Sequence, residues 1–371
     1  MQLNDVALVH PLALGGEGPS VVVKDCFDIA GTVTGIGSEA YSDALPAESN
    51  ARVIENVLNA GCRIIGKANM HELAFGMTGV NNFYGTPVNP RWPELIPGGS
   101  SSGSAVAVAA GWCDFAIGTD TGGSIRQPAT CCGVFGFKPT FGRLSHAGIK
   151  GSNSSLDCAG PIARDIDMIE TAMKAMDPSF FADNLQRKPR IGRINISSKL
   201  GPEILHLLRS FASLPVVELK SLDAAFDAAM IIIGYETALE YGHLLDTRSP
   251  LGEDVALRLG EARKITEQSV SRAEVVRKQF CKQVDELLLN FDALLLPAMP
   301  DIPPTVNSVR NKRSVLWTTQ FLRPFNLSGH PAITIPFLSK NGWPVGMQLV
   351  GKKNEDAKLC AIARQLKHTS I

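Results

Sequence analysis

Glycine residues gather between Gly98 and Gly160, and this clustering constrains the fold more than any other feature of the chain. Two runs stand out: residues 98–104 read GGSSSGS, and residues 118–126 read GTDTGGSIR. Glycine adopts backbone conformations that other residues avoid, and it lets a ligand approach the main chain closely. Both runs therefore predict tight loops, and the chemistry of the protein is expected in this segment.

The chain around these loops alternates between expected strands and helices, which indicates an α/β fold class. A loop over 96–104 leads into a helix of small residues at 105–110, and 118–124 is a turn that follows a strand. The other expected strands and helices follow from apolar runs and helical spacing. The expected strands are 21–23, 62–65, 115–117, 292–297, 332–337 and 345–350, and the expected helices are 51–60, 69–75 and 355–367.

The length of 371 residues exceeds the ~250–300 residues over which one hydrophobic core usually grows. Residues 177–190 are polar with two prolines and mark a junction, and 203–289 are mostly helical. Neither end of the chain has enough expected strands for a sheet of its own. We therefore expect a single domain over 1–371. Its core is expected from 20–178 and 287–367, and a helical variable insert from 190–286.

Charge and hydropathy exclude several classes of protein. The chain has 36 basic residues (lysine and arginine) and 36 acidic residues (aspartate and glutamate). It therefore lacks the basic excess that favours binding to nucleic acids or anionic membranes. No apolar run reaches the ~20 residues that span a bilayer, and residues 1–14 lack the basic start of a signal peptide. The eight cysteines have no CxxC spacing, which favours reduced thiols. We expect a cytoplasmic protein with no metal or cofactor and with no nucleic-acid or membrane partner.

The second glycine-rich run and Lys24 together are suited to nucleophilic catalysis. A Thr-Gly-Gly-Ser turn over 121–124 can aim successive N–H groups at one point, as an oxyanion requires. Ser124 at the end of this turn is placed to attack a carbonyl, but it needs a base. Lys24 follows three valines, so burial is expected to lower its pKa and to leave a neutral amine.

Other interpretations of the serine-rich run stay open. Residues 99–103 fit the GxSxG nucleophile elbow, in which Ser101 attacks and His243 or His330 is the base. Pro97 and the glycines after it are poor strand material, whereas such an elbow prefers a strand before the serine. The run taken alone also fits a flexible linker.

The sequence resembles the amidase signature family of hydrolases. The resemblance is close over 20–178 and moderate over 287–351, whereas 180–286 match loosely. It implies a large mixed β-sheet core flanked by helices on both faces. The motifs that carry it are VVVKD (21–25), AGCRIIGKANMHE (60–72), GGSSSGSAVAVAAG (98–111), GTDTGGSIRQPATCCGVFGFKPTFGR (118–143), SSLDCAGPIARD (154–165), NLSGHPAITIPF (326–337) and GWPVGMQLVG (342–351).

The resemblance also implies a Ser-cisSer-Lys triad formed by Ser124, Ser100 and Lys24, with a cis peptide bond before the second serine. The oxyanion hole then consists of the N–H groups of Thr121, Gly122, Gly123 and Ser124. The residues expected to position these groups are Asp120, Arg126, Asp25, Ser101 and Ser102. The residues expected to line the substrate pocket are Met77, Thr78, Gly79, Gln127, Trp317, Phe321 and Arg323.

Three functions compete. The first is hydrolysis of a small amide through a Ser124 acyl-enzyme, because 84–99 and 153–165 resemble small-amide and indole-3-acetamide amidases. The second is the glutaminase component of a tRNA-dependent amidotransferase, because 122–129 and 154–162 are similar to that group. The third is a non-catalytic scaffold or binding protein, which the intact triad disfavours. The expected partner is a small-molecule amide. A homodimer is the candidate assembly, and the short region before the lysine disfavours membrane association.

Overall fold

The computed structural model describes residues 6–151, 153–196, 199–310 and 315–369. Strands and helices alternate along much of this chain, as the sequence predicts. The strands are β1 (Leu8–Gly15), β2 (Ser20–Lys24), β3 (Arg63–Ala68), β4 (Phe115–Thr119), β5 (Phe135–Lys138), β6 (Ala159–Ala163), β7 (Ile191–Ile194), β8 (Val216–Val217), β9 (Ala293–Pro297), β10 (Ala332–Leu338) and β11 (Pro344–Gly351). The α-helices are α1 (Arg52–Asn59), α2 (Ser102–Ala109), α3 (Arg126–Cys132), α4 (Ile166–Met176), α5 (Pro202–Arg209), α6 (Leu222–Tyr241), α7 (His243–Asp246), α8 (Glu253–Ala262), α9 (Glu267–Asn290), α10 (Val306–Arg310), α11 (Arg323–Leu327) and α12 (Asp356–Thr369). Short 3-10 helices are η1 (Glu39–Tyr41), η2 (Glu72–Ala74) and η3 (Leu316–Thr319).

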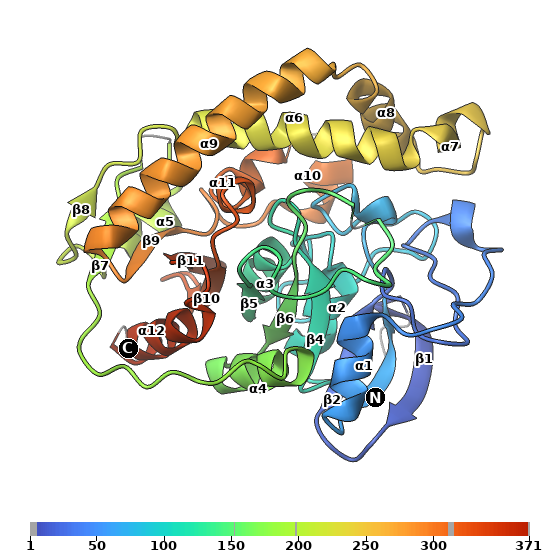
Figure 1. Ribbon diagram of the computed structural model, residues 1–371, viewed down its shortest axis with the longest axis horizontal. Coiled ribbons are helices and arrows are strands. Elements are labelled where there is room, and N and C mark those ends of the chain that lie inside the picture. The colour runs from blue at the N-terminus through green and yellow to red at the C-terminus, as the bar shows by residue number, and fades with distance from the viewer. Residues whose placement is uncertain (1–5, 152, 197–198, 311–314, 370–371) are drawn as a thin grey trace.

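The described strands form one sheet in the order β1-β3-β2-β4-β6-β5-β10-β11-β9-β7-β8. β3, β2 and β4 are parallel neighbours, as are β9, β7 and β8. The neighbours from β4 through β6, β5, β10 and β11 to β9 pair antiparallel. The sheet is therefore mixed and draws on both ends of the chain, which confirms the predicted α/β class (Figure 1).

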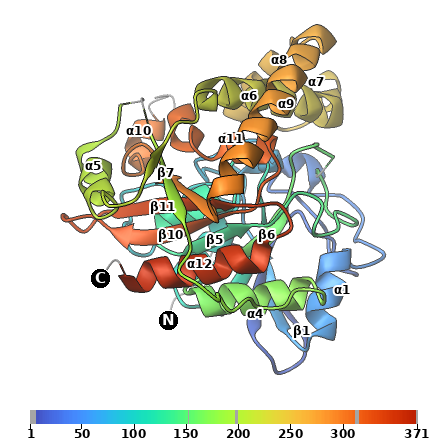
Figure 2. The same ribbon diagram turned by 60° about the vertical axis from the view of Figure 1, so that its left-hand side comes forward.

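Helices cover both faces of this sheet because its strands are apolar on both faces. Val21 and Val23 of β2 pack in the same cluster as residues of α1, α4 and α12, whereas Val22 packs with α2 and α3. In β9, Leu295 belongs to the first of these clusters, whereas Leu294 packs with α6 and α9. Successive side chains of a strand point to opposite faces, so each strand contributes to two cores. Figures 1 and 2 show α4 and α12 below the sheet and α6 and α9 above it.

One local expectation from the sequence was wrong. Residues 69–75 do not form the predicted helix, because Leu73 and Ala74 adopt left-handed backbone angles, with φ of 53° and 54°. Only η2 forms there. The segment 190–286 is mostly helical, with α5 to α8 and most of α9, and it also adds β7 and β8 to the edge of the sheet beside β9.

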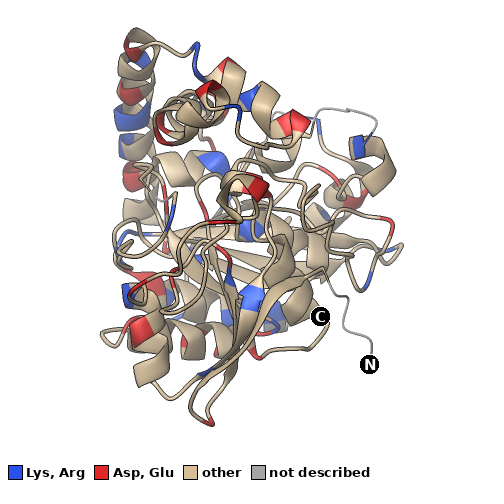
Figure 3. Cartoon of the chain, turned by 90° about the vertical axis from the view of Figure 1, so that its right-hand side faces the viewer, with Lys and Arg blue, Asp and Glu red and all other residues tan. Residues whose placement is uncertain are grey.

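The sheet brings the predicted catalytic segments together. β2 and β4 are adjacent and parallel, with Val23 paired to Ile117, so Lys24 and Thr119 lie at the same edge of the sheet. α2 begins at Ser102 and packs against both strands, which places the serine-rich loop over that edge. No helix among the described residues is long and apolar enough to cross a membrane. Figure 3 shows acidic and basic residues mixed along the outer helices in that view.

Candidate active site

Lys24 lies at the end of β2 with its side chain fully buried. Its Nζ donates to Ser100 Oγ at 2.7 Å and to Thr119 Oγ1 at 2.7 Å. Within the described residues, no carboxylate lies within ion-pair distance of this amine. Burial lowers the pKa of Lys24, because a charged amine is poorly solvated there. The arrangement favours a neutral amine that can accept a proton. Sequence reasoning missed Thr119, since its role depends on the pairing of β2 with β4.

The serine-rich loop holds Ser100 against this lysine. The Gly99–Ser100 peptide bond is cis. Gly99 N–H donates to Gln127 Oε1 at 2.8 Å, and Ser101 N–H donates to the Ser124 carbonyl at 3.2 Å. The loop is therefore tied to the Gly-rich turn on one side and to α3 on the other. Gln127 supports the loop instead of lining the pocket, which corrects the prediction for this residue.

Asp120 organises the Gly-rich turn that carries Ser124. Its carboxylate accepts hydrogen bonds from Gly123 N–H at 2.7 Å and from Ile125 N–H at 3.1 Å. Arg126 also donates to it through Nε at 2.9 Å and through Nη2 at 2.9 Å. Burial alone would raise the pKa of Asp120, but the charge of Arg126 and these hydrogen bonds hold the pKa well below its usual range. The turn is thus built on a buried carboxylate that stays ionised.

This bonding corrects the predicted oxyanion hole. Gly123 N–H is already engaged by Asp120, so it is not free to bind an oxyanion. The N–H groups of Thr121, Gly122 and Ser124 have no acceptor among the residues that the structure describes. These three groups remain as candidate donors to a developing negative charge.

Arg126 anchors the turn to the C-terminal part of the sheet and is itself fully buried. Its Nη1 donates to the Leu322 carbonyl at 3.0 Å and to Gln348 Oε1 at 2.5 Å, and Nη2 donates to Asn326 Oδ1 at 2.5 Å. These partners lie about two hundred residues further along the chain. Arg126 therefore connects the turn to α11 and β11, beneath the pocket.

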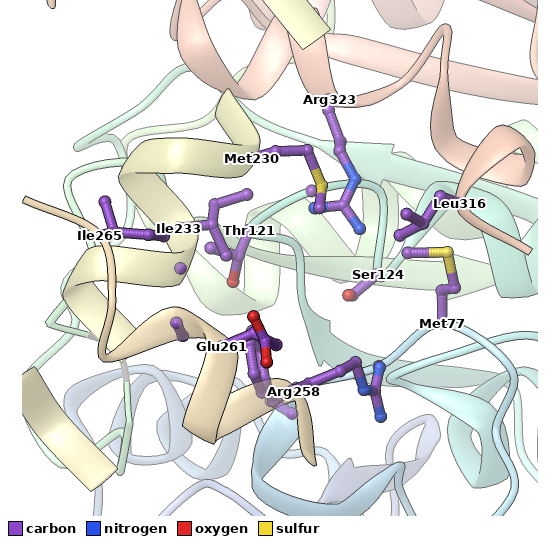
Figure 4. A pocket seen from close by; sticks show the side chains of 16 residues that line it. Met77, Thr121, Ser124, Met230, Ile233, Arg258, Glu261, Ile265, Leu316 and Arg323 are labelled. Atoms are coloured by element: carbon purple, nitrogen blue, oxygen red, sulfur yellow. The ribbon is translucent and has the colours of Figure 1, made fainter. Parts of the chain in front are cut away.

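A pocket of about 270 Å³ lies in front of the turn (Figure 4). Figure 4 shows the Ser124 hydroxyl pointing into it. No hydrogen bond joins Ser124 Oγ to Ser100 Oγ within the described structure, and such catalytic contacts often tighten only when substrate binds. The pocket is lined by Ala74, Phe75, Gly76, Met77, Thr121, Gly122, Ser124, Met230, Ile233, Gly234, Arg258, Glu261, Ala262, Ile265, Leu316 and Arg323.

The pocket contains two of the side chains predicted to line it, Met77 and Arg323. Phe321 is fully buried in the core beside α6 and α9, and Trp317 does not line the pocket, whereas Leu316 does. Successive side chains of a 3-10 helix such as η3 point about a third of a turn apart, so Leu316 and its neighbour Trp317 face different directions. Thr78 and Gly79 do not line it either. Thr78 caps Val80 N–H at 3.1 Å, and Gly79 packs against the Gly98 carbonyl and the Ser102 side chain.

The remaining predicted positioning residues have separate partners. Asp25 pairs with Lys67 at 2.9 Å instead of contacting Lys24. Ser101 Oγ donates to the Thr119 carbonyl at 3.3 Å. Ser102 Oγ is buried with no hydrogen-bond partner in the described chain.

The nucleophile-elbow interpretation is wrong for this fold. Among the described residues, Ser101 bonds only to backbone groups, and neither candidate histidine contacts it. His330 contacts Asp285 Oδ1 at 2.9 Å and Ser328 Oγ at 2.9 Å, and His243 lies exposed in α7. No group of three or more histidine, cysteine or acidic side chains in the described residues is arranged to hold a metal ion.

Asp157 is a further buried acid beside the turn that sequence reasoning missed. It accepts a hydrogen bond from Thr121 Oγ1, and from Ser154 N–H at 3.2 Å. Burial raises the pKa of Asp157 to about 7, although these hydrogen bonds oppose the shift. The motif SSLDCAGPI contained this residue, but nothing local in it indicated contact with Thr121.

The buried lysine–serine pair beside the glycine-rich turn, taken with the family match and the amidase relatives given next, identifies the chain as a hydrolase of C–N amide bonds. The model of the Amidase family matches residues 17–190 and 190–360, and the chain belongs to this family. This confirms the resemblance that the motifs carried.

The relatives fall into two kinds. The chain is 30% identical to Amidase 1 of Arabidopsis thaliana over 94% of this chain and 92% of that protein. It is also 30% identical to the A-type subunit of glutamyl-tRNA(Gln) amidotransferase from Marinomonas sp., over 98% of this chain and 86% of that protein. A crystal structure of an amidase, at 30% identity, aligns with a TM-score of 0.87 over 98% of this chain and 92% of that chain.

Proposed function

We propose that the chain hydrolyses a small amide through a covalent acyl-enzyme on Ser124, with Ser100 and Lys24 as proton relay. The observation that carries the proposal is the 2.7 Å contact between Lys24 Nζ and Ser100 Oγ in a fully buried setting without an ion-pair partner among the described residues. Nucleophilic serine needs an adjacent base, and a desolvated neutral lysine can act as one.

The proposed reaction proceeds in two halves. Ser124 Oγ attacks the amide carbon while its proton passes to Ser100 Oγ, whose own proton passes to Lys24 Nζ. The carbonyl electrons move onto oxygen, and the N–H groups of Thr121, Gly122 and Ser124 stabilise that charge. The C–N bond then breaks, and the relay returns a proton to the leaving nitrogen. Water attacks the acyl-enzyme by the same relay and releases the acid and free Ser124.

The walls of the pocket favour a compact acyl group. Met77, Met230, Ile233, Ile265 and Leu316 present apolar surface around the nucleophile. This surface suits the carbon skeleton of a small amide. All eight cysteines are free, which supports the proposal that the protein acts in the reducing cytoplasm.

The test is ammonia release by the purified chain from a panel of amides. The panel contains indole-3-acetamide, benzamide, aliphatic amides, malonamate and glutamine. Ser124→Ala is expected to lower kcat by on the order of 10⁴-fold or more. The matched control is Ser104→Ala, because Ser104 is a buried serine of α2 whose hydroxyl, within the described residues, bonds only to the Ile117 carbonyl, at 3.3 Å. This control is expected to keep its activity.

Activity that persists in Ser124→Ala would overturn the assignment of the nucleophile. Release from glutamine alone, and only with an added partner protein, would instead favour the glutaminase function. The relatives that are A-type subunits of glutamyl-tRNA(Gln) amidotransferase make that outcome the second candidate.

A further inference from the structure

The pocket holds one buried cation whose hydrogen-bonding capacity is largely unused. Arg323 opens α11 and is 8% exposed. Its Nε donates to Thr319 Oγ1 at 2.7 Å, and its Cζ lies 5.8 Å from the ring centroid of Phe226. In the described part of the chain, neither Nη1 nor Nη2 donates to an acceptor, and no carboxylate lies within ion-pair distance.

This guanidinium faces the space beside the nucleophile. Figure 4 shows it pointing into the pocket between Thr121 and Ser124. A Cβ added at Gly122 would lie 3.2 Å from Arg323 Nη1, so the cation is close to the backbone of the turn. A group bound to Nη1 would therefore lie within a short carbon chain of an amide held at Ser124.

The other arginine of the pocket is engaged. Arg258 Nη2 donates to Asp254 Oδ2 at 2.7 Å, and its Nε donates to the Asp254 carbonyl at 3.1 Å. Glu261, the acidic residue of the lining, is 74% exposed at its side chain and pairs with Lys264 at 2.5 Å. Neither side chain neutralises Arg323.

A buried guanidinium without a partner is costly, because desolvation is not offset by an opposite charge. Burial lowers the pKa of Arg323 to about 10, and the charge of Arg258 acts in the same direction. The group nevertheless stays charged at neutral pH. Its planar fork of donors matches a carboxylate, which can accept two parallel hydrogen bonds.

We propose that Arg323 binds a carboxylate on the acyl part of the substrate, so that the preferred amides are monoamides of short dicarboxylic acids. The apolar wall then surrounds the methylene carbons between the two ends. This assignment rests on the proposed function, since it assumes that the amide carbon is held at Ser124.

The test compares acidic amides with uncharged partners of nearly the same shape. Malonamate is matched with acetoacetamide, and succinamate with levulinamide, in which a methyl ketone replaces the carboxylate. Wild type, Arg323→Met, Arg323→Lys and Arg258→Met are assayed for kcat and KM. We expect wild type to prefer the acidic amides. Arg323→Met should lose about 10- to 100-fold in kcat/KM on them, mainly through KM, and change the ketones by less than about threefold.

Three outcomes decide whether Arg323 binds the carboxylate. Equal loss of kcat on acidic and uncharged amides would assign it to the oxyanion and overturn the proposal. Loss of the acidic preference in Arg258→Met, but not in Arg323→Met, would also overturn it. Partial recovery of the preference in Arg323→Lys, which keeps the charge, would support it.

Calorimetric titration with succinate separates this proposal from the proposed function, because it needs no turnover. Succinate binding that weakens at least about tenfold in Arg323→Met supports the carboxylate site even if no amide is hydrolysed. Hydrolysis of uncharged amides without succinate binding or acidic preference overturns the carboxylate site and leaves the proposed function intact.

Discussion

Replacing Arg126 with methionine should remove the counter-ion of the buried Asp120 carboxylate. Arg126 and Asp120 are both fully buried, and Nη2 lies 2.9 Å from Oδ1. The replacement also removes donors to the Leu322 carbonyl, Gln348 and Asn326. Asp120 would keep the N–H groups of its own turn, but it would no longer face an opposite charge.

Removing one partner of a buried ion pair typically costs about 3–5 kcal/mol. A chain of 371 residues has an unfolding entropy of roughly 0.8 kcal/mol/K, which converts that loss into a fall in Tm of about 4–6 °C. Because the turn also carries Ser124, we expect kcat to fall as well. The matched control is Arg263→Met, whose exposed arginine pairs with the exposed Asp246 at 2.8 Å and should cost no more than about 1 kcal/mol.

The pH dependence of the stability shows whether the unpaired Asp120 carboxylate causes the loss in Arg126→Met. In wild type the pKa of Asp120 is held low, so its contribution is fully present above the ordinary aspartate pKa and is lost only in strong acid. Without Arg126, burial dominates and raises this pKa, so the folded variant takes up a proton as the pH falls. The difference in the free energy of unfolding between wild type and Arg126→Met should therefore become smaller as the pH falls from about 8 to about 5. Urea unfolding of both proteins at both pH values measures this difference. A difference from wild type that does not change with pH, or one as small as that of Arg263→Met, would refute the reasoning.

Three further predictions concern Lys24, its partner Thr119, and the acid beside the turn, Asp157. Because Lys24 must be neutral and burial lowers its pKa, kcat/KM should rise with pH until that pKa is passed, and a profile flat from about pH 5 to about pH 9 would contradict the role. Thr119→Val removes one hydrogen-bond acceptor of the Lys24 amine, and such an acceptor stabilises the charged amine more than the neutral one. Its loss should therefore lower the pKa of Lys24 and move the acidic limb of that profile down by up to about one pH unit. An upward shift would exclude this role. Asp157→Asn keeps an acceptor for Thr121 and removes a carboxyl whose pKa burial raises to about 7. Because the folded protein keeps this carboxyl protonated where the unfolded chain does not, the free energy of unfolding of wild type falls as the pH rises from about 4 to about 7. Relative to wild type, Asp157→Asn should therefore gain on the order of a few kcal/mol across that window, as measured by thermal unfolding. A gain confined to lower pH would contradict the raised pKa.

The amino-acid sequence by itself determined the fold class, the family and the segments that form the candidate site. Residues 98–104 and 118–126 are local motifs whose glycines and serines predict loops of one kind. The valines before Lys24 likewise predict a dry lysine at the end of a buried strand, and its side chain is fully buried. These inferences needed only neighbours in sequence.

Tertiary structure alone decided which groups complete the site. Thr119 reaches Lys24 because β4 pairs with β2, and Asn326 of α11 donates to Asp120 although about two hundred residues separate them. The open guanidinium of Arg323 is visible only once the carboxylates around it are assigned to other partners. Each of these facts depends on contacts between segments far apart in sequence, and such contacts are set by how strands and helices pack.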